Sequence, residues 1–294
     1  MKVATKNPDL LSGGKDFGME FLTRSKSKKD SFSVLPGEHY HDHYEIFYLY
    51  SGERYYFIQN QSYYIKKGDL VIIDALDLHK TLDGDTEQYQ RFLINFKKSF
   101  LPEHGEELLN CFSSGTNVMR LNESEQAFVE ELLLKMFSEH NSRRFGREIY
   151  LKSLLSELLV FINRLPFEIY PKELFSYSPM HLKISEAAKY IQSHCGEILT
   201  LEDVAKKFYI SPYYFCRKFK EVTGFNFSQY LNLTRIRQAQ KLLLQTDLSV
   251  SEISGKTGFE SQTHFGRIFK ATTGLSPLQY KKKHLNPEFN AENI

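Results

Sequence analysis

The sequence predicts an α+β protein, with an antiparallel β-barrel and two helices in its N-terminal part and an all-α C-terminal part. Three observations lead to this prediction. Short runs of alternating aromatic and β-branched residues, separated by turn residues, occupy residues 31–100. After about residue 120 the apolar residues recur at helical spacing. Near the C-terminus one stretch of sequence occurs twice with an offset of 50 residues, which indicates two copies of one helical unit.

The length and composition are those of a globular protein. The 294 residues suffice for two or three domains, and 41% hydrophobic with 25% charged residues excludes a disordered or fibrous chain. The cysteines, Cys111, Cys195 and Cys216, lack CxxC spacing, which argues against a disulfide framework or a structural zinc site. The sequence shows neither an apolar run of roughly 18 residues nor a signal peptide. We therefore expect a soluble, cytoplasmic protein without a membrane partner.

The barrel is expected to lie within residues 15–110. Turn residues such as Ser51-Gly52 and Lys67-Gly68-Asp69 separate its apolar runs, and no helical pattern lies between them. Short strands at regular spacing without intervening helices favour an antiparallel barrel or sandwich. The expected strands are residues 45–50, 54–59, 63–65, 70–73 and 92–96.

A pair of amphipathic helices follows within residues 120–165. The first is predicted over residues 123–140, where Asn122 or Ser124 provides the cap, and the second over residues 146–164. Both helices carry wide apolar stripes, which could pack against the barrel or form the interface of a homodimer. Two stripes this rich in leucine favour a mixture, with one part covering the barrel and another part left for dimerisation.

A linker separates these helices from the C-terminal domain. It is predicted over residues 166–180, because three prolines at positions 166, 171 and 179 interrupt any regular helix there. The C-terminal domain is predicted over residues 181–284.

The internal repeat aligns residues 215–230 with residues 265–280, and eight of the 16 positions are identical. In each copy a serine caps a helix, two phenylalanines four residues apart face the core, and a glycine ends the helix. These residues are Ser211, Phe215, Phe219 and Gly224 in the first copy and Ser261, Phe265, Phe269 and Gly274 in the second.

A shorter amphipathic helix precedes each copy. Residues 201–208 follow the cap Thr200, and residues 250–257 follow the cap Ser249. A short helix, a tight turn and a second helix with a basic outer face form a helix-turn-helix unit. Residues 228–245 are expected to form a helix that links the two units.

The charges are distributed unevenly along the chain. From residue 180 to residue 285 there are 16 Lys or Arg and 8 Asp or Glu, a net charge of +8, whereas the rest of the chain has 22 and 28, a net charge of −6. A helical bundle with solvated basic faces is the simpler alternative. The repeated outward Arg-x-x-Lys pattern on a basic domain favours double-stranded DNA as the partner instead.

The second repeat copy and the linking helix carry a specific residue pattern. It consists of Ile253-Ser254, Gly258-Phe259, His264-Phe265-Gly266-Arg267-Ile268-Phe269-Lys270, Gly274, Pro277 and Tyr280, and, in the linking helix, Arg235, Ala239, Leu242 and Leu243. In this pattern the C-terminal domain resembles the AraC/XylS family of bacterial transcription regulators, with Ser254, Thr257 and His264 in place of the family's usual Ala, Val and Tyr. The resemblance implies that both recognition helices enter successive major grooves on one face of bent DNA, that RNA polymerase is a further partner, and that no cofactor or catalysis is involved.

Nine side chains are expected to contact DNA. Six of them are expected at base edges, since Arg pairs with guanine and Gln with adenine, and three lysines are expected at phosphates. Gly266 offers no side chain, so the second unit is expected to read fewer bases. The base-edge candidates are Tyr213, Cys216, Arg217, Gln262, Thr263 and Arg267, and the phosphate candidates are Lys218, Lys220 and Lys270.

A histidine-rich pattern at the start of the barrel region resembles the two cupin motifs. Side chains alternate along a strand, so its histidines and its glutamate would share one face. The matching residues are His39, His41, Glu45 and Gly52 in the first motif and Gly68 and His79 in the second, while Asp74, Leu76 and Asp83 depart from the usual Pro, Gly and Asn.

Three interpretations of this cluster compete. His39, His41, Glu45 and His79 could bind a divalent metal, because imidazoles and a carboxylate suit Mn, Fe, Ni or Zn. The same residues, with Tyr48 or another tyrosine stacking nearby, could bind an organic effector such as a sugar. They could also be remnants without a ligand, whose hydrogen bonds are satisfied within the protein. AraC-like sensor domains resemble cupins and sense small molecules, which favours the effector interpretation.

The sequence therefore favours a sequence-specific transcription regulator, an activator that responds to a small molecule in the N-terminal barrel, over an enzyme. One alternative is a metal-dependent cupin enzyme fused to a DNA-binding domain. Another is a constitutive DNA-bending protein that needs no ligand.

Overall fold

The computed structural model describes residues 10–11, 14–25, 41, 43–84, 86–166 and 179–285. The chain divides into two compact units, with the main boundary between residues 176 and 177. Most of the expected linker, residues 167–178, lies outside the described residues.

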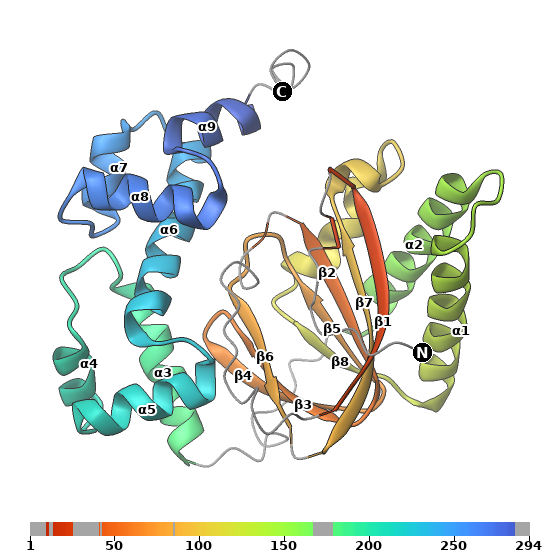
Figure 1. Ribbon diagram of the computed structural model, residues 1–294, viewed down its shortest axis with the longest axis horizontal. Helices are drawn as coiled ribbons and strands as arrows, with labels where there is room; N and C mark the ends of the chain where they lie inside the picture. The colour runs from red at the N-terminus through yellow and green to blue at the C-terminus, as the bar shows by residue number, and fades with distance from the viewer. Residues whose placement is uncertain are drawn as a thin grey trace. The chain divides into compact units, whose positions relative to one another are not determined.

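The N-terminal unit is built on two β-sheets (Figure 1). One sheet has the strand order β1-β7-β2-β5-β8 and the other β4-β3-β6. All four pairings of the larger sheet are antiparallel, and so is the β3–β6 pairing. The strands are β1 (Phe17–Ser25), β2 (Tyr44–Ser51), β3 (Glu53–Ile58), β4 (Gln61–Lys66), β5 (Asp69–Ile73), β6 (His79–Asp83), β7 (Gln88–Phe96) and β8 (Val118–Arg120).

The structure confirms the α+β class and differs from the expectation in two respects. Within the described residues the strands pair as two sheets, so the expected barrel does not close into one hydrogen-bonded ring. Strands β1, β6 and β8 lie outside the five expected strands. The apolar run of β8 is only three residues long and β6 is mostly polar, so neither gives a strong alternation pattern.

The central strand β2 separates two apolar clusters by the alternation of its side chains. Phe47 and Leu49 belong to a cluster that includes residues of both sheets. Ile46 and Tyr48 point to the other side, into a cluster shared with two helices. The N-terminal unit therefore has three layers, with the larger sheet in the middle.

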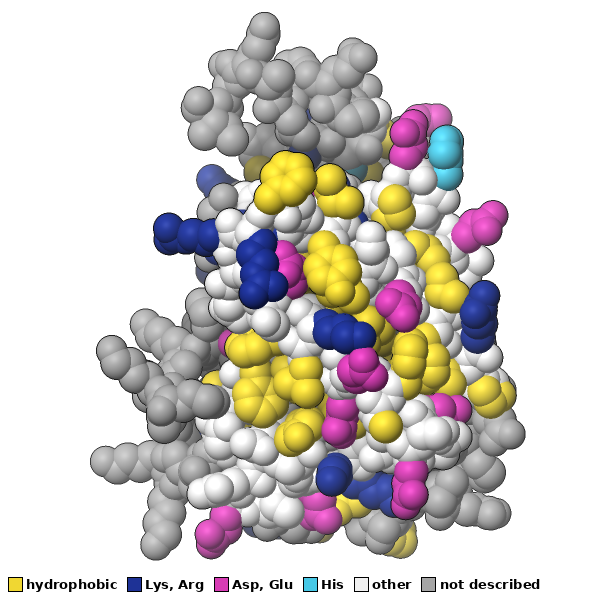
Figure 2. Space-filling view, turned by 90° about the vertical axis from the view of Figure 1, so that its right-hand side faces the viewer, with side chains coloured by type: hydrophobic (Ala, Val, Ile, Leu, Met, Phe, Trp, Pro, Cys, Tyr) yellow, Lys and Arg dark blue, Asp and Glu magenta, His cyan; other side chains and the backbone are white. Residues whose placement is uncertain are grey.

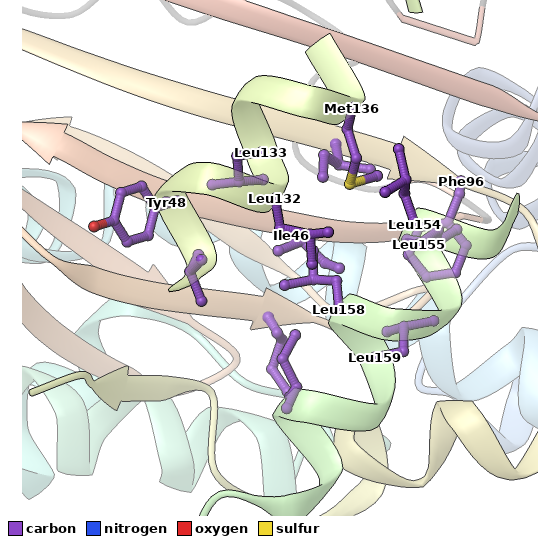
Figure 3. Close-up of a cluster of buried hydrophobic side chains, with 14 of the residues drawn as sticks. Ile46, Tyr48, Phe96, Leu132, Leu133, Met136, Leu154, Leu155, Leu158 and Leu159 are labelled. Carbon is purple, nitrogen blue, oxygen red and sulfur yellow. The ribbon is translucent and has the colours of Figure 1, made fainter. Parts of the chain in front are cut away.

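Helices α1 (Glu123–His140) and α2 (Arg147–Arg164) cover the larger sheet (Figure 1). Asn122 and Glu125 form a capping box that satisfies backbone donors at the start of α1. Figure 3 shows how the helices present their leucines to β2 and β7. The labelled side chains are Leu132, Leu133, Met136, Leu154, Leu155, Leu158 and Leu159 from the helices, and Ile46, Tyr48 and Phe96 from the strands.

Two 3₁₀ helices, Lys98–Phe100 and Gly105–Ser113, connect β7 to β8 and lie outside the expected elements. The second packs against α2 and buries Cys111 and Phe112. Among the described residues, no helix combines the length and the apolar character needed to cross a membrane.

The C-terminal unit consists of helices joined by tight turns, as expected. Helix α6 is the long linking helix, and it contacts helices on both sides of it in the sequence. The helices are α3 (Pro179–Ser193), α4 (Leu201–Lys207), α5 (Pro212–Thr223), α6 (Phe227–Gln245), α7 (Val250–Lys256), α8 (Gln262–Thr273) and α9 (Pro277–Leu285).

The same aromatic cluster forms in both copies of the repeat. The Phe215 and Phe219 rings are 5.3 Å apart, and Phe219 meets Tyr230 edge to face at 5.4 Å. The corresponding distances in the second copy are 5.5 Å from Phe265 to Phe269 and 5.5 Å from Phe269 to Tyr280. Five of these six side chains are at most 1% exposed and Tyr280 is 3% exposed, so they fix which face of each helix is buried.

The ends of the repeated helices are also built alike. Thr223 and Thr273 donate to the carbonyls of the phenylalanines four residues before them, and the next residue is a glycine with a left-handed backbone, Gly224 at φ 77° and Gly274 at φ 75°. Gln229 and Gln279 then accept hydrogen bonds from the backbone N–H groups of the residues that cap α6 and α9.

Two glycines of α8 allow a matched test of this backbone geometry. Gly266 lies inside the helix, where an added Cβ meets no atom within 4 Å, so we expect Gly266→Ala to stabilise the protein by about 0.5–1 kcal/mol. Gly274 is equally open but has φ +75°, so Gly274→Ala should destabilise it by about 1 kcal/mol. Urea unfolding followed by circular dichroism measures both, and shifts in the same direction would contradict this account.

Candidate nucleic-acid interface and histidine cluster

Two helix-turn-helix units lie in the C-terminal unit. In the first, α4 packs against α5, and in the second α7 packs against α8. Thr200 and Ser249 cap the short helices α4 and α7 by accepting backbone N–H groups. The chain takes a left-handed conformation at Tyr209 in the first turn and at Gly258 in the second, with φ of 54° and 81°.

The outer face of α5 carries four of the expected DNA-contacting side chains. Tyr213 is 80% exposed, and Cys216 and Arg217 are also exposed, while Lys220 is half-buried on the same face. Helical geometry places these four within about 100° of one another, opposite the buried phenylalanines. The guanidinium of Arg217 lies 5.2 Å from the ring centre of Tyr214, which limits the directions it takes.

Lys218 lies apart from this face. It is about 140° around the helix from Tyr213. Its ammonium group donates to both carboxylate oxygens of Glu221, at 2.8 and 2.9 Å. The structure thus gives Lys218 a carboxylate partner on its own helix, which the sequence pattern alone did not indicate.

The outer face of α8 has the same layout with smaller side chains. Thr263, Arg267 and Lys270 are exposed and fall within about 60° of one another around the helix. Gln262 is exposed in the first turn, about 140° from Arg267. Gly266 leaves open space where Cys216 stands on α5.

The eight repeated side chains divide into two groups. Six of them form the aromatic cluster, the helix ends and the caps described above. The other two, an arginine and a lysine, take no part in any of these. In both copies they lie on the outer face of the second helix of the unit, as Arg217 and Lys220 on α5 and as Arg267 and Lys270 on α8.

The histidine cluster lies in the N-terminal unit. His41 precedes β2, Glu45 is the second residue of β2, and His79 is the first residue of β6. One ligand atom of each lies within 4.8 Å of the others, and Glu45 and His79 are buried. The Glu45 Oε2 atom is 3.6 Å from His41 Nε2 and 3.8 Å from His79 Nε2.

The hydrogen bonds of the two imidazoles fix their tautomers. His41 Nδ1 is 2.9 Å from the His43 carbonyl oxygen, and His79 Nδ1 is 2.7 Å from the Asp77 carbonyl oxygen. A carbonyl oxygen only accepts, so both Nδ1 atoms carry a proton. In the neutral rings the lone pairs are therefore on Nε2, directed toward Glu45.

Glu45 is held as a buried carboxylate. Burial alone would raise its pKa, but the adjacent imidazoles of His41 and His79, when protonated, and the hydrogen bond from Tyr56 outweigh burial and hold the pKa of Glu45 well below its ordinary value. The Tyr56 hydroxyl donates to Glu45 Oε1 at 2.6 Å. Burial lowers the pKa of His79, with the Glu45 charge opposing. Tyr56 is not among the predicted site residues. It lies on the same side of β3 as Arg54 and Ile58, because side chains two residues apart on a strand share one face.

The prediction for this cluster also includes His39 and Tyr48. His39 lies outside the described residues. Tyr48 lies on the opposite side of β2, where its hydroxyl donates to Glu130 of α1 at 2.7 Å. Residues 45 and 48 are an odd number apart, so strand alternation places their side chains on opposite sides of the sheet.

Comparison with known protein families identifies both units. Residues 33–159 match the model described as an AraC-like ligand binding domain, and residues 204–283 match a helix-turn-helix domain. The two matched segments contain the histidine cluster and the two candidate DNA-binding helices, respectively.

Three curated relatives illustrate the similarity. The regulator YbfI of Bacillus subtilis is 30% identical over 233 residues, which cover 77% of this chain and 80% of YbfI. The transcriptional activator RhaR of Shigella dysenteriae is 24% identical over 85% of this chain and 88% of its own length. The regulatory protein PocR of Salmonella typhimurium is 35% identical over 106 residues, which span 36% of this chain and 35% of PocR.

The two tyrosine–glutamate hydrogen bonds permit a prediction about the histidine cluster. Tyr56→Phe leaves the buried Glu45 without its hydroxyl donor, so we expect a loss of about 1–3 kcal/mol in the free energy of unfolding. Tyr48→Phe removes a similar bond to Glu130, which is half-buried and accessible to water, so its loss should be smaller. Chemical denaturation of both variants measures the difference, and equal losses would contradict this assignment.

Proposed function

Because this chain belongs to the AraC/XylS family of transcription regulators, we propose that it controls transcription by inserting α5 and α8 into the major groove of double-stranded DNA. The N-terminal unit, which matches an AraC-like ligand binding domain, then binds the small molecule that sets the activity. The proposal involves no catalytic step.

One observation carries the DNA-binding proposal. Six of the eight repeated side chains account for the packing and the ends of the helices, whereas the repeated arginine and lysine do not. Both cations lie on the outer face of the second helix in each unit. A chain segment with a net charge of +8 supplies the attraction for a phosphate backbone.

The exposed side chains divide between base edges and phosphates. Arg217 and Arg267 suit the two acceptors of guanine, and their neighbours on the outer faces read adjacent positions. These neighbours are Tyr213, Cys216, Gln262 and Thr263. Lys220 and Lys270 contact phosphates, which position the protein without specifying the sequence. Lys218 contributes less, because its ammonium group is already paired with Glu221.

The N-terminal unit supplies the response to an effector. We assign His41, Glu45 and His79 as its polar ligand-contacting groups, and a hydroxyl-rich molecule such as a sugar suits them. The effector shifts the protein toward the state for which it has higher affinity. RhaR is named a transcriptional activator, which favours activation through contact with RNA polymerase. The protein would act in the cytoplasm, where its DNA lies.

The outer surface of α1 and α2 is proposed as the homodimer interface. Figure 2 shows apolar side chains interspersed with charges on the side of the molecule where these helices lie. Leu134 is 54% exposed, Ile149 is 73% exposed and Tyr150 is 48% exposed. The buried leucines of the same helices cover the larger sheet. Under this proposal, one surface of the helix pair packs inside the protomer and the other joins two protomers.

The DNA-binding proposal is tested with duplexes selected from a random-sequence pool by the wild-type protein. We expect Arg217→Ala and Arg267→Ala each to cost about 1–3 kcal/mol of specific binding, or about 5- to 150-fold in Kd, measured by fluorescence anisotropy. Lys98→Ala is the control. It removes one positive charge from an exposed pair with Glu106 in the N-terminal unit, outside α1 and α2, and should leave the affinity unchanged. Full affinity in both arginine variants would contradict the assignment of α5 and α8.

The dimer proposal is tested with two exposed isoleucines. Ile149→Asp places a charge in the proposed interface, and we expect the dimer to dissociate at least about tenfold more readily in sedimentation equilibrium. Ile198→Asp makes the same change at a side chain that is 78% exposed in the C-terminal unit, and it should leave the association unchanged. A wild-type monomer, or equal effects of both changes, would overturn this interface.

A further inference from the structure

We propose that Arg235 of α6 fixes the position of one helix-turn-helix unit relative to the other and thereby sets the spacing of the two DNA segments that the protein recognises. The inference rests on the proposed function, because it concerns how α5 and α8 reach DNA together. It assigns Arg235 as a positioning residue, which acts through contacts inside the protein and not through a contact with DNA.

Helix α6 packs with both helix-turn-helix units, and Arg235 lies where the two sets of contacts meet. Near the start of the helix, Tyr230 packs on Phe219 of α5. Directly after Arg235, Ile236 belongs to the apolar cluster that includes Phe265 of α8. The side chain of Arg235 therefore starts from the part of α6 that lies between the two units.

The guanidinium of Arg235 connects a loop of the first unit to the turn of the second. Its Nε donates to the Cys195 carbonyl oxygen at 2.7 Å and its Nη2 to the Glu197 carbonyl oxygen at 2.8 Å, both in the loop that leads into α4. The same group lies 5.6 Å from the ring centre of Phe259, in the turn between α7 and α8. Because the donors of a guanidinium form a rigid fork, these contacts fix the loop in one orientation.

The loop and the turn also pack directly against each other, with a glycine on each side. A Cβ on Gly196 would lie 2.8 Å from the Lys256 carbonyl oxygen, and a Cβ on Gly258 would lie 2.6 Å from the Cys195 carbonyl oxygen. Real Cβ atoms do not approach other atoms so closely, so neither position accepts a side chain without a shift of the backbone. The hydrogen bonds of Arg235 hold this close backbone contact in place.

The turn of the first unit shows what the close contact changes. Tyr209 and Gly258 each lie two residues after the short helix of their unit, and both have a left-handed backbone. The Tyr209 side chain is 92% exposed, so the first turn accommodates a large residue that extends into solvent. The glycine in the second turn therefore meets a demand of the packing between the two units, in addition to its left-handed conformation.

A fixed relative position of α5 and α8 has two consequences for DNA binding. Once one helix has bound, the other is already held near its groove, so the second contact loses less entropy. The fixed position also selects the spacing, because one added base pair moves the second DNA segment by about 3.4 Å and turns it by about 35°. Loss of Arg235 should therefore weaken binding to both segments together and not to either segment alone.

The experiment uses the full-length protein and a duplex that carries one copy of the sequence selected by the wild type, with Kd measured by fluorescence anisotropy at low salt. Some duplexes have one base pair inserted between the two recognised segments, and others have one segment scrambled. We expect Arg235→Ala to weaken binding to the intact duplex about 10- to 100-fold and to bind single-segment duplexes within about twofold of the wild type. The insertion should weaken the wild type at least about tenfold and the variant less than about threefold.

Three further variants separate positioning from charge and from folding. Arg235→Lys keeps the positive charge but lacks the rigid fork, so it should show the same relaxed spacing as Arg235→Ala. Gly196→Ala keeps Arg235 but displaces the loop from Lys256, and it replaces Arg235→Ala if circular dichroism shows that variant to be unfolded. Gly255→Ala, in α7, is the matched control. Its added Cβ meets no atom within 4 Å, so it should keep the wild-type spacing dependence.

The outcomes distinguish this inference from the proposed function. Wild-type spacing dependence in Arg235→Ala or, where that variant is unfolded, in Gly196→Ala would overturn the role of Arg235. An equal loss on intact and single-segment duplexes would also overturn it, since a phosphate contact gives that result. Both results leave the DNA-binding proposal standing, whereas a wild type that binds none of the selected duplexes overturns the proposed function and this inference together.

Discussion

The edge-to-face contact of Phe219 with Tyr230, repeated by Phe269 with Tyr280, is the interaction on which the C-terminal unit depends. It joins the second helix of each helix-turn-helix unit to the helix that follows, and it decides which side of α5 and α8 is buried. Once that side is fixed, the helical period of 3.6 residues leaves Arg217 and Arg267 on the outside. A change in this packing would turn the cations away from solvent, so the packing and the proposed recognition of DNA are inseparable.

The repeat made this unit predictable from sequence. The offset of 50 residues aligns the repeated Phe, Gly and Tyr residues, which define the packing and the end of each helix. The predicted helix boundaries agree with the structure within one or two residues. The ion pair of Lys218 is not predictable in this way. Its pairing with Glu221 depends on side-chain positions along one helix that the repeat does not constrain, because the second copy has Ile268 and Ala271 at those places.

The sequence predicts the fold class of the N-terminal unit, but it does not predict all of the strands. Strong alternating runs identified the central strands, whereas the polar β6 and the short β8 gave little periodic signal. The cluster of His41, Glu45 and His79 was visible as a motif, but Tyr56 became visible only when β3 paired with β6. Tyr48, expected to stack near an effector, lies on the other side of β2 from the cluster, and the parity of residues 45 and 48 already separates them.

The empty place left by Gly266 on the outer face of α8 has a consequence for evolution. A Cβ added there meets no atom within 4 Å, so a helix-compatible side chain starts in open space, away from the Phe265–Phe269 packing. Single-codon changes at this position could therefore retarget one half of the binding site while the scaffold stays constant. Closely similar regulators could diverge in the promoters they serve through this residue alone.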